Sequence, residues 1–252
     1  LDASWHLPNS ERNAKEEYKS NHIKNSIFFD IDKYSDQNSP LPHMLPSRND
    51  WENIISSLGI KNSDQVVVYD NSEVFSACRV WYSFIYFGHN PNLVSVLDGN
   101  FNKWLGEKKP TSKEILKIVY SKYKATEDTS LVINKDQVNQ NIKKKNFLLI
   151  DARGEKRFLG LQPEPREGMR SGHIEGSKNL PFQLLINKDR TFKKRDELTS
   201  IFKKKEISID KDKVFSCGSG ITACILGLAN SLITDKKPKI YDGSWAEYGL
   251  EN

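Results

Sequence analysis

The feature that most constrains the fold of this chain is an internal repeat. Four landmarks occur in the same order in both halves of its 252 residues. The first set comprises LDASW from Leu1, NHIKNSIFFDID from Asn21, VVVYDNSEVFSA from Val66 and LDGNFNKW from Leu97. The second set comprises LIDARGEKRF from Leu149, GHIEGSKNLPF from Gly172, KVFSCGSGITA from Lys213 and YDGSWAEY from Tyr241. Self-similarity on this scale predicts two homologous units.

The repeat also indicates where one unit ends and the other begins. Between the two sets lies a stretch rich in Lys, Thr and Ser and interrupted by Pro110, a composition typical of a connection. We therefore predict an N-terminal domain over residues 1–106, a linker over residues 107–130 and a C-terminal domain over residues 131–252. A chain of this length accommodates two compact domains, since domains of roughly 100 to 150 residues are the commonest.

Short apolar runs in each half are followed by helical periodicity. Residues 66–69, 147–150 and 214–215 are continuous apolar runs, which are typical of strands buried on both faces. Residues 74–87 and 221–233 follow such runs directly and are largely apolar, as helices packed on a sheet would be. Strands that alternate with helices predict an α/β fold with a parallel sheet in each half.

The charge pattern limits the classes of partner. The net charge is +5, and the excess is mostly lysine in runs such as residues 143–145 and 203–205. Because no aromatic or arginine residues accompany these runs, they indicate a solvated surface and no nucleic-acid partner. No apolar stretch reaches the roughly 18 residues of a membrane span, so we expect no membrane partner either.

Cysteine content and the start of the chain bear on its compartment. Three cysteines are an odd number in a chain of this length, which fits a reducing compartment and favours a cytoplasmic protein. The first residues resemble the end of a strand, so we expect a segment before Leu1. No metal-ligand cluster and no nucleotide-binding fingerprint occurs in the sequence, which implies neither a metal nor another cofactor.

Cys217 is the strongest candidate for chemistry. It ends the apolar run KVFS and is followed by Gly218, Gly220 and a helical pattern. A strand-loop-helix arrangement aims backbone N–H groups and a helix N-terminus at the sulfur. Such surroundings stabilise a thiolate, which is the nucleophilic form of cysteine. Cys78 and Cys224 lie within apolar helical patterns and are expected in the core.

The loop CGSGITA resembles the active-site loop of the 3-mercaptopyruvate sulfurtransferases, a family of the rhodanese superfamily. The likeness continues, in family order and over nearly the whole chain, through LDASW, FFDID, SPLPHMLP, DGNFNKW, PEPR, SGHIEGS and YDGSWAEYG. It implies two tandem rhodanese-like domains, each a parallel sheet flanked by helices, with the active cysteine in the second. Asp70 stands in the first half where Cys217 stands in the second. A carboxylate cannot carry a persulfide, so the first domain is expected to be inactive.

The resemblance implies an enzyme that transfers sulfur from 3-mercaptopyruvate. Cys217 would take the sulfur as a persulfide, release pyruvate and pass the sulfur to a second thiol, such as that of thioredoxin, or to cyanide. Covalent catalysis of this kind predicts ping-pong kinetics. The resemblance further implies that the protein is a monomer.

The resemblance also implies a set of site residues. Arg157 and Arg166 match the substrate-binding pair of the family, and guanidinium groups suit a carboxylate beside a keto oxygen. Further substrate-binding positions are Gly218, Gly220, Ile221 and Thr222. Ser219, His43 and Asp32 match the family's proton relay, in which a carboxylate orients a histidine that shuttles a proton near neutral pH.

Three other functions are compatible with parts of the sequence. Thiosulfate sulfurtransferases use the same cysteine, but their loops carry basic residues where this chain has Gly218, Ser219 and Gly220. This neutral loop favours 3-mercaptopyruvate as the donor. A cysteine phosphatase needs an arginine six positions after the cysteine, where this chain has Ala223. A non-catalytic binding module would not need Cys217, which is present.

Several polar residues have a structural alternative. His43 lies between prolines and is equally consistent with a packed loop residue. His22 and His173 occupy equivalent positions of the repeat, which argues for a role in the fold that both domains share. Asp151 and Arg153 are likewise expected to be structural, because an aspartate recurs at the same place in the inactive half.

Overall fold

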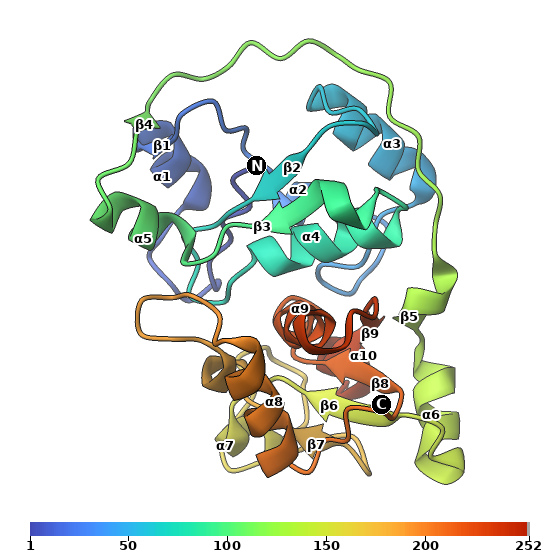
Figure 1. Ribbon diagram of the computed structural model, residues 1–252. Coiled ribbons are helices and arrows are strands. Elements are labelled where there is room, and N and C mark those ends of the chain that lie inside the picture. The colour runs from blue at the N-terminus through green and yellow to red at the C-terminus, as the bar shows by residue number, and fades with distance from the viewer. Residues whose placement is uncertain (251–252) are drawn as a thin grey trace. The chain divides into compact units, whose positions relative to one another are not determined.

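The computed structural model describes residues 1–250, which form two compact units (Figure 1). Unit 1 comprises Leu1–Asn38, Leu45–Asp128 and Lys188–Thr191, and unit 2 comprises the remaining segments. Two short segments therefore depart from chain order. Ser39–Met44 groups with unit 2, and Lys188–Thr191 groups with unit 1. This exchange of segments does not follow from a single boundary between the two halves of the sequence.

Unit 2 is built on a five-stranded sheet in which all neighbouring strands run parallel. The strand order is β5-β9-β8-β6-β7. The bounds are Val132–Ile133 for β5, Leu148–Asp151 for β6, Lys178–Asn179 for β7, Lys213–Ser216 for β8 and Lys239–Tyr241 for β9. β8 occupies the centre, all four of its residues are buried, and Ser216 lies opposite Asp151 of β6. The predicted parallel α/β sheet is confirmed.

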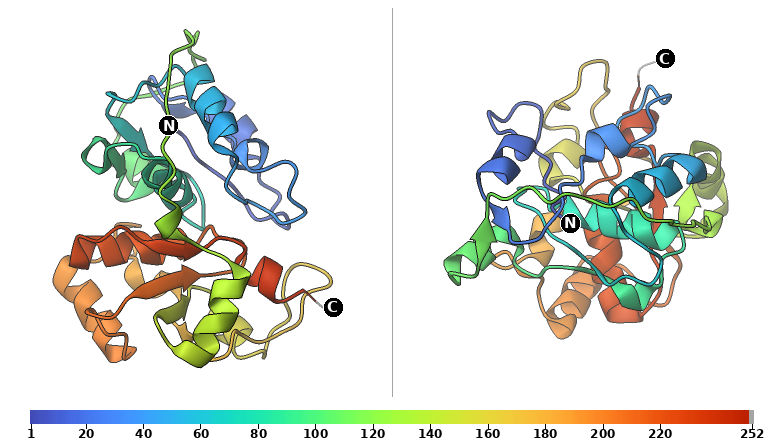
Figure 2. Two further views of the ribbon diagram at one scale, coloured as in Figure 1. Left: turned by 90° about the vertical axis from the view of Figure 1, so that its right-hand side faces the viewer. Right: turned by 90° about the horizontal axis from the view of Figure 1, so that it is seen from above.

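Helices cover the sheet of unit 2 on both sides. They are α6 (Lys135–Lys144), α7 (Glu155–Phe158), α8 (Arg195–Lys204), α9 (Ala223–Thr234) and α10 (Ser244–Tyr248). α9 packs against α8 and β8, and Figure 2 shows the strands between α9 and α6. Val138 of α6 and Trp245 of α10 join Leu149, Val214 and Tyr241 in one buried apolar cluster. This packing fixes the position of β8 and of the loop that follows it.

Unit 1 has a related plan with fewer parallel strands. β2 (Val66–Val68) and β3 (Val94–Val96) pair in parallel, and parallel bridges from Asp2 to Phe28 and Tyr69 extend the pairing. β1 (His22–Ile23) and β4 (Thr111–Ser112) pair antiparallel in a separate sheet. The helices are α1 (Ala14–Ser20), α2 (Ile31–Tyr34), α3 (Arg48–Ser57), α4 (Ala77–Tyr86) and α5 (Asn100–Gly106).

One strand expectation was wrong. The apolar run at residues 66–69 predicted a strand buried on both faces, but Val67 is 44% exposed while Val66 and Val68 are buried. Successive side chains of a strand point to opposite faces. α4 packs on β2 and β3, so the run of valines marks a strand that is covered on one face.

The segment predicted as a linker packs on unit 1 for most of its length. β4 pairs with β1 at its start, and Asp128 is still part of unit 1. Tyr123 is 2% exposed, and its backbone N–H donates to Ser56 Oγ at 3.0 Å. Ser121 is also buried and donates through its hydroxyl to the carbonyl of Ile60. The connection is therefore an extended arm of the first unit.

The two repeat histidines have the same surroundings in their respective units. The ring of His22 stacks on Tyr18 at 4.1 Å, and its Nδ1 lies 2.7 Å from the Tyr18 carbonyl oxygen. The ring of His173 stacks on Phe158 at 4.0 Å, and its Nδ1 lies 2.8 Å from the Phe158 carbonyl oxygen. Each histidine therefore contacts both the ring and the backbone carbonyl of one aromatic residue, which is a structural role.

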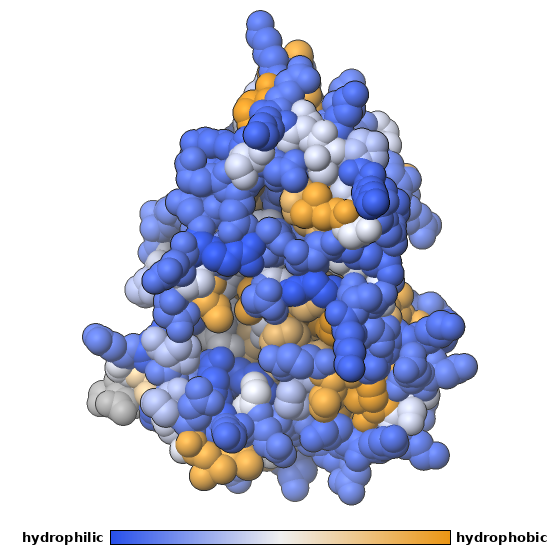
Figure 3. All heavy atoms as spheres, turned by 90° about the vertical axis from the view of Figure 1, so that its left-hand side faces the viewer, coloured by the Kyte–Doolittle hydropathy of each residue, from blue (hydrophilic) through white to orange (hydrophobic). Residues whose placement is uncertain are grey.

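Charged side chains dominate the surface. Figure 3 shows a largely hydrophilic face on which apolar residues form small separate patches. Lys143, Lys144 and Lys145 are all exposed, as a solvated surface requires. Within residues 1–250, no helix is long and apolar enough to cross a membrane, and no group of three His, Cys, Asp or Glu side chains is arranged to hold a metal ion. The cytoplasmic location stays a prediction.

Candidate active site

Cys217 follows the central strand β8 directly and is 1% exposed. The start of α10 anchors its backbone on both sides. The N–H of Cys217 donates to Ser244 Oγ at 3.1 Å, and the N–H of Trp245 donates to the Cys217 carbonyl at 2.9 Å. The N–H of Ala246 donates to the carbonyl of Gly218 at 2.8 Å. These bonds hold the first half of the loop in one place relative to the sheet.

The second half of the loop turns into α9. Gly220 has φ of 78°, a left-handed conformation that glycine adopts without steric cost. Thr222 is the N-cap of α9, and its carbonyl accepts the N–H of Ile225 at 3.2 Å. Ile221 is 3% exposed, and its carbonyl accepts the N–H of Cys224 at 3.1 Å. The predicted loop residues thus form one continuous turn between β8 and α9.

The structure brings two of the predicted relay residues together. Nδ1 of His43 lies 2.9 Å from Ser219 Oγ, and both residues are buried. His43 has φ of 61°, a conformation that is uncommon for residues other than glycine. Both belong to unit 2, since Ser39–Met44 groups with that unit. Ser219 lies two residues from Cys217. The imidazole is therefore hydrogen-bonded to the loop that carries Cys217, residues 217–222, which we call the cysteine loop.

Asp32, the third predicted relay residue, lies in α2 of unit 1. Both of its carboxylate oxygens accept the indole N–H of Trp5 at 3.0 Å. Its side chain is exposed, whereas Trp5 is buried. The Trp5 contact orients the carboxylate, and its part in a proton relay stays a prediction.

Arg157 lies on α7 and contacts both the cysteine loop and a buried carboxylate. A Cβ at position 218 would lie 3.3 Å from Arg157 Nη2, so the guanidinium lies against Gly218. Arg157 forms an ion pair with Glu164, whose side chain is only 4% exposed. Glu164 also accepts from Arg153 Nη1 at 2.7 Å, and Arg153 Nη2 donates to Asp151 Oδ2 at 2.7 Å. A chain of alternating charges thus fixes the guanidinium of Arg157.

The same network gives Arg153 and Asp151 the structural role expected for them. The guanidinium carbon of Arg153 lies 4.4 Å from the ring centroid of Trp245, the residue whose N–H holds the Cys217 carbonyl. Arg166 lies half-buried in the irregular segment between α7 and β7.

Two residues that the sequence analysis did not single out support this site. Glu164 pairs with two arginines, and Ser244 accepts from the backbone of Cys217. Signals for both were present in the sequence. Glu164 lies inside PEPR, and the DGSW motif around Ser244 recurs as DGNF in the first half.

In the equivalent loop of unit 1, backbone N–H groups donate hydrogen bonds to the carboxylate of Asp70. Its carboxylate accepts the N–H of Ser72 at 3.0 Å and the N–H of Ala77, the first residue of α4, at 2.8 Å. The N–H of Phe101 donates to the Asp70 carbonyl at 2.9 Å, as Trp245 does to Cys217. In unit 1 the loop therefore places two backbone N–H groups on the carboxylate of Asp70.

The buried Asp70 predicts a pH-dependent stability. Burial raises the pKa of Asp70 from 3.8 to about 6, so between these values the folded chain keeps a proton that the unfolded chain has lost. We expect this residue to lower the free energy of unfolding by about 2 to 3 kcal/mol as the pH rises from about 4 to 7. Urea denaturation at both pH values measures the change. Asp70→Asn should remove it, and an identical pH dependence in variant and native chain would contradict the expectation.

Comparison with known proteins gives one consistent family. The rhodanese-like domain matches twice, at residues 12–107 and 134–251. The chain is 40% identical over 250 residues to the mouse (Mus musculus) 3-mercaptopyruvate sulfurtransferase, covering 98% of this chain and 84% of the relative. It is 41% identical over 251 residues to the thiosulfate sulfurtransferase of Cricetulus griseus, with the same coverage.

A solved structure agrees with the sequence relatives. SseA from Escherichia coli, a 3-mercaptopyruvate sulfotransferase of rhodanese fold, superposes with a TM-score of 0.87 and is 34% identical. The match covers 98% of this chain and 92% of SseA. A match over 98% of the chain extends over both units.

Proposed function

This chain belongs to the rhodanese family, and we propose that it is an enzyme that transfers sulfur from 3-mercaptopyruvate to a second thiol through a persulfide on Cys217. The observation that carries the proposal is the anchored loop after β8. Ser219 of this loop lies two positions after Cys217 and is hydrogen-bonded to His43. A buried cysteine whose own loop carries a serine hydrogen-bonded to an imidazole suits covalent catalysis with a proton transfer.

The first step forms the persulfide. The Cys217 thiolate attacks the thiol sulfur of 3-mercaptopyruvate, a new S–S bond forms, and the bond from sulfur to the methylene carbon breaks. The electron pair of that bond moves to the leaving group as the enolate of pyruvate, while the transferred sulfur keeps its hydrogen. The Asp70 loop supports this step, because there the same turn hydrogen-bonds an anion through backbone N–H groups.

The leaving group needs one proton to become pyruvate. We assign delivery of this proton to the hydroxyl of Ser219. His43, which is hydrogen-bonded to Ser219, would then return a proton to the serine. Asp32 is the proposed carboxylate that orients His43. Arg157 and Arg166 are proposed to bind the carboxylate and keto oxygen of the donor, where the enolate charge develops. The ion pair with Glu164 orients Arg157 for this role.

The second step returns the enzyme to its thiol form. An acceptor thiolate attacks the outer sulfur of the persulfide, and the Cys217 thiolate leaves. A protein thiol such as that of thioredoxin, a small thiol or cyanide would serve chemically. We further propose that the protein acts as a monomer.

The donor distinguishes the two closest functions. Identity does not select between them, because relatives named for either donor are 40% and 41% identical. The neutral residues of the loop favour 3-mercaptopyruvate over the dianionic thiosulfate. We expect kcat/KM for 3-mercaptopyruvate to exceed that for thiosulfate by at least about tenfold. Steady-state kinetics with one acceptor and both donors tests this, and a tenfold preference for thiosulfate would overturn the donor assignment.

His43→Ala tests the proton transfer separately. With 3-mercaptopyruvate, kcat should fall about 100-fold, because general acid catalysis contributes about that much or more. With thiosulfate, kcat should change much less, because sulfite leaves without needing a proton. An equal loss with both donors would indicate that His43 only supports the fold of the loop.

A further inference from the structure

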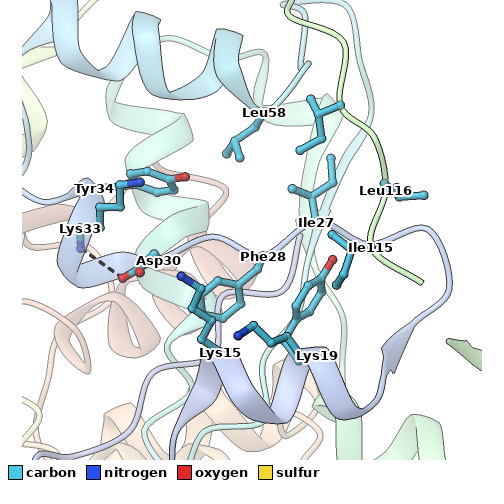
Figure 4. A pocket seen from close by; sticks show the side chains of 12 residues that line it. Lys15, Lys19, Ile27, Phe28, Asp30, Lys33, Tyr34, Leu58, Ile115 and Leu116 are labelled. Carbon is cyan, nitrogen blue, oxygen red and sulfur yellow. Dashed lines mark hydrogen bonds between the residues drawn. The ribbon is translucent and has the colours of Figure 1, made fainter. Parts of the chain in front are cut away.

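Unit 1 contains a cavity of about 290 Å³ on the surface beside α1 (Figure 4). This volume lies near the lower end of the range of about 300 to 1,000 Å³ found for small-molecule sites. All of its lining residues belong to unit 1, at positions 15–34, 58 and 115–118. No residue of the loop that carries Cys217 lines the cavity.

One end of the cavity is apolar. Leu58 at the end of α3 and Ile27 lie across the cavity from Ile115 (Figure 4). Ile115, Leu116 and Ile118 of the extended arm together form an apolar wall. Ile115 is 57% exposed and Ile118 is 38% exposed. Apolar side chains that remain exposed around a concave surface favour an apolar occupant.

The wall is held in place at both ends. Before it, β4 pairs with β1, with His22 opposite Ser112. After it, the arm approaches Gly59 so closely that a Cβ there would lie 2.8 Å from the Val119 carbonyl oxygen. Gly59 also has φ of 74°, which disfavours any other residue. Contacts within unit 1 therefore fix the wall of the cavity.

The other end of the cavity is basic. Lys15 and Lys19 extend from successive turns of α1, and Lys33 extends from α2 (Figure 4). Lys19 also forms an exposed ion pair with Glu16 at 2.7 Å, with which a bound carboxylate would compete. The one acidic lining residue, Asp30, caps α2 by accepting the backbone N–H of Lys33 at 3.2 Å. Burial raises the pKa of Tyr34, whose neutral hydroxyl points into the cavity toward Leu58 (Figure 4).

We propose that this cavity binds a small amphipathic carboxylate, with its hydrocarbon part against the arm and its carboxylate among the lysines. The separation of an apolar end from a basic end fits a molecule with one anionic group and one apolar body. Three lysines without an arginine fork suit a single carboxylate, because planar two-point recognition is the property of arginine.

Octanoate is a suitable probe, and isothermal titration calorimetry of the full chain measures its binding. We expect saturable binding with a dissociation constant of about 0.1 to 1 mM, the range of a weak ligand with about ten heavy atoms. Acetate lacks the apolar part and octylammonium has the opposite charge, so neither should bind measurably in that range. Octanoate binding that is no tighter than that of octylammonium would overturn the proposal.

Two double variants locate the site. Lys15→Glu with Lys19→Glu should weaken octanoate binding at least about fivefold, because two attractive charges become repulsive. Lys24→Glu with Lys61→Glu makes the same charge change on unit 1 outside the cavity and should leave binding unchanged. Equal effects of the two pairs would overturn the assignment.

Arg157→Ala separates this site from the catalytic one. The variant should bind octanoate as the native chain does, because Arg157 lies in unit 2. Loss of octanoate binding in Arg157→Ala would place the probe at the cysteine loop and overturn the proposal, while leaving the sulfurtransferase function in place.

Discussion

Cys217→Ser is expected to lower turnover of 3-mercaptopyruvate by at least about 10⁴-fold, the scale of loss when a covalent nucleophile is removed. A serine oxygen cannot form a persulfide, so neither half of the reaction remains. The fold should persist, because the anchors of the loop at this position are its backbone N–H and carbonyl, which hydrogen-bond Ser244 and Trp245. Pyruvate release measured with a fixed acceptor gives the comparison.

Cys224→Ser is the matched control for that variant. Cys224 is also fully buried, and its thiol donates to the Gly220 carbonyl at 3.2 Å, a hydrogen bond that a serine hydroxyl can keep. We expect its turnover to stay within a few-fold of the native value. Comparable losses in Cys217→Ser and Cys224→Ser would indicate damage to the loop and contradict the assignment of the nucleophile.

Arg157→Ala should reduce kcat/KM for 3-mercaptopyruvate about 100-fold. A bidentate, charge-assisted contact to the donor is worth about 3 kcal/mol. Arg157 is a quarter exposed and lies against Gly218 of the cysteine loop, so its outer edge can meet a bound donor. Arg157→Lys keeps the charge but loses the fork and should recover only part of the rate.

Lys156→Ala is the control on the same helix. Lys156 is exposed and lies next to Arg157 in α7, and its removal changes the net charge equally. We expect its kinetics to match those of the native chain. Because Arg157→Ala also deprives the buried Glu164 of one partner, thermal unfolding of each variant should be followed. Unchanged 3-mercaptopyruvate kinetics in a folded Arg157→Ala would refute the substrate-binding role.

Much of the architecture could be predicted because the repeated sequence landmarks mark equivalent elements in the two halves. Equivalent landmarks at Asp70 and Cys217 predicted two related loops, and both loops follow a parallel strand and precede a helix. Apolar periodicity placed the helices that became α4 and α9 within a few residues. The pairing of a histidine with an aromatic ring recurs in both units, at His22 and His173.

What could not be predicted depends on contacts between distant segments. No local pattern shows that Ser39–Met44 groups with the second unit, where His43 meets Ser219 across 176 positions. The apolar run around Val67 resembles the run that forms β8. Only the packing shows that the strand at Val67 is covered on one face, whereas β8 is buried on both. The arm around Pro110 is rich in Lys, Thr and Ser, a composition typical of a linker, yet Tyr123 within it is buried against unit 1.

The sequence shows the residue types of the candidate site, but not the contacts that support them. The cysteine loop and Arg157 carry residue types that reaction chemistry requires. Glu164 acts through a buried ion-pair network with Arg153 and Arg157, and such a network is defined only by three-dimensional proximity. Ser244 supports Cys217 through one hydrogen bond to the backbone, which leaves little trace in the sequence.

The mass of the intact protein after brief exposure to 3-mercaptopyruvate tests the central claim most directly. The native chain should gain the mass of one sulfur atom and lose it when a thiol acceptor is added, whereas Cys217→Ser should gain nothing. A folded native chain that gains no sulfur, or a Cys217→Ser variant that gains the same mass, would contradict sulfur transfer through Cys217.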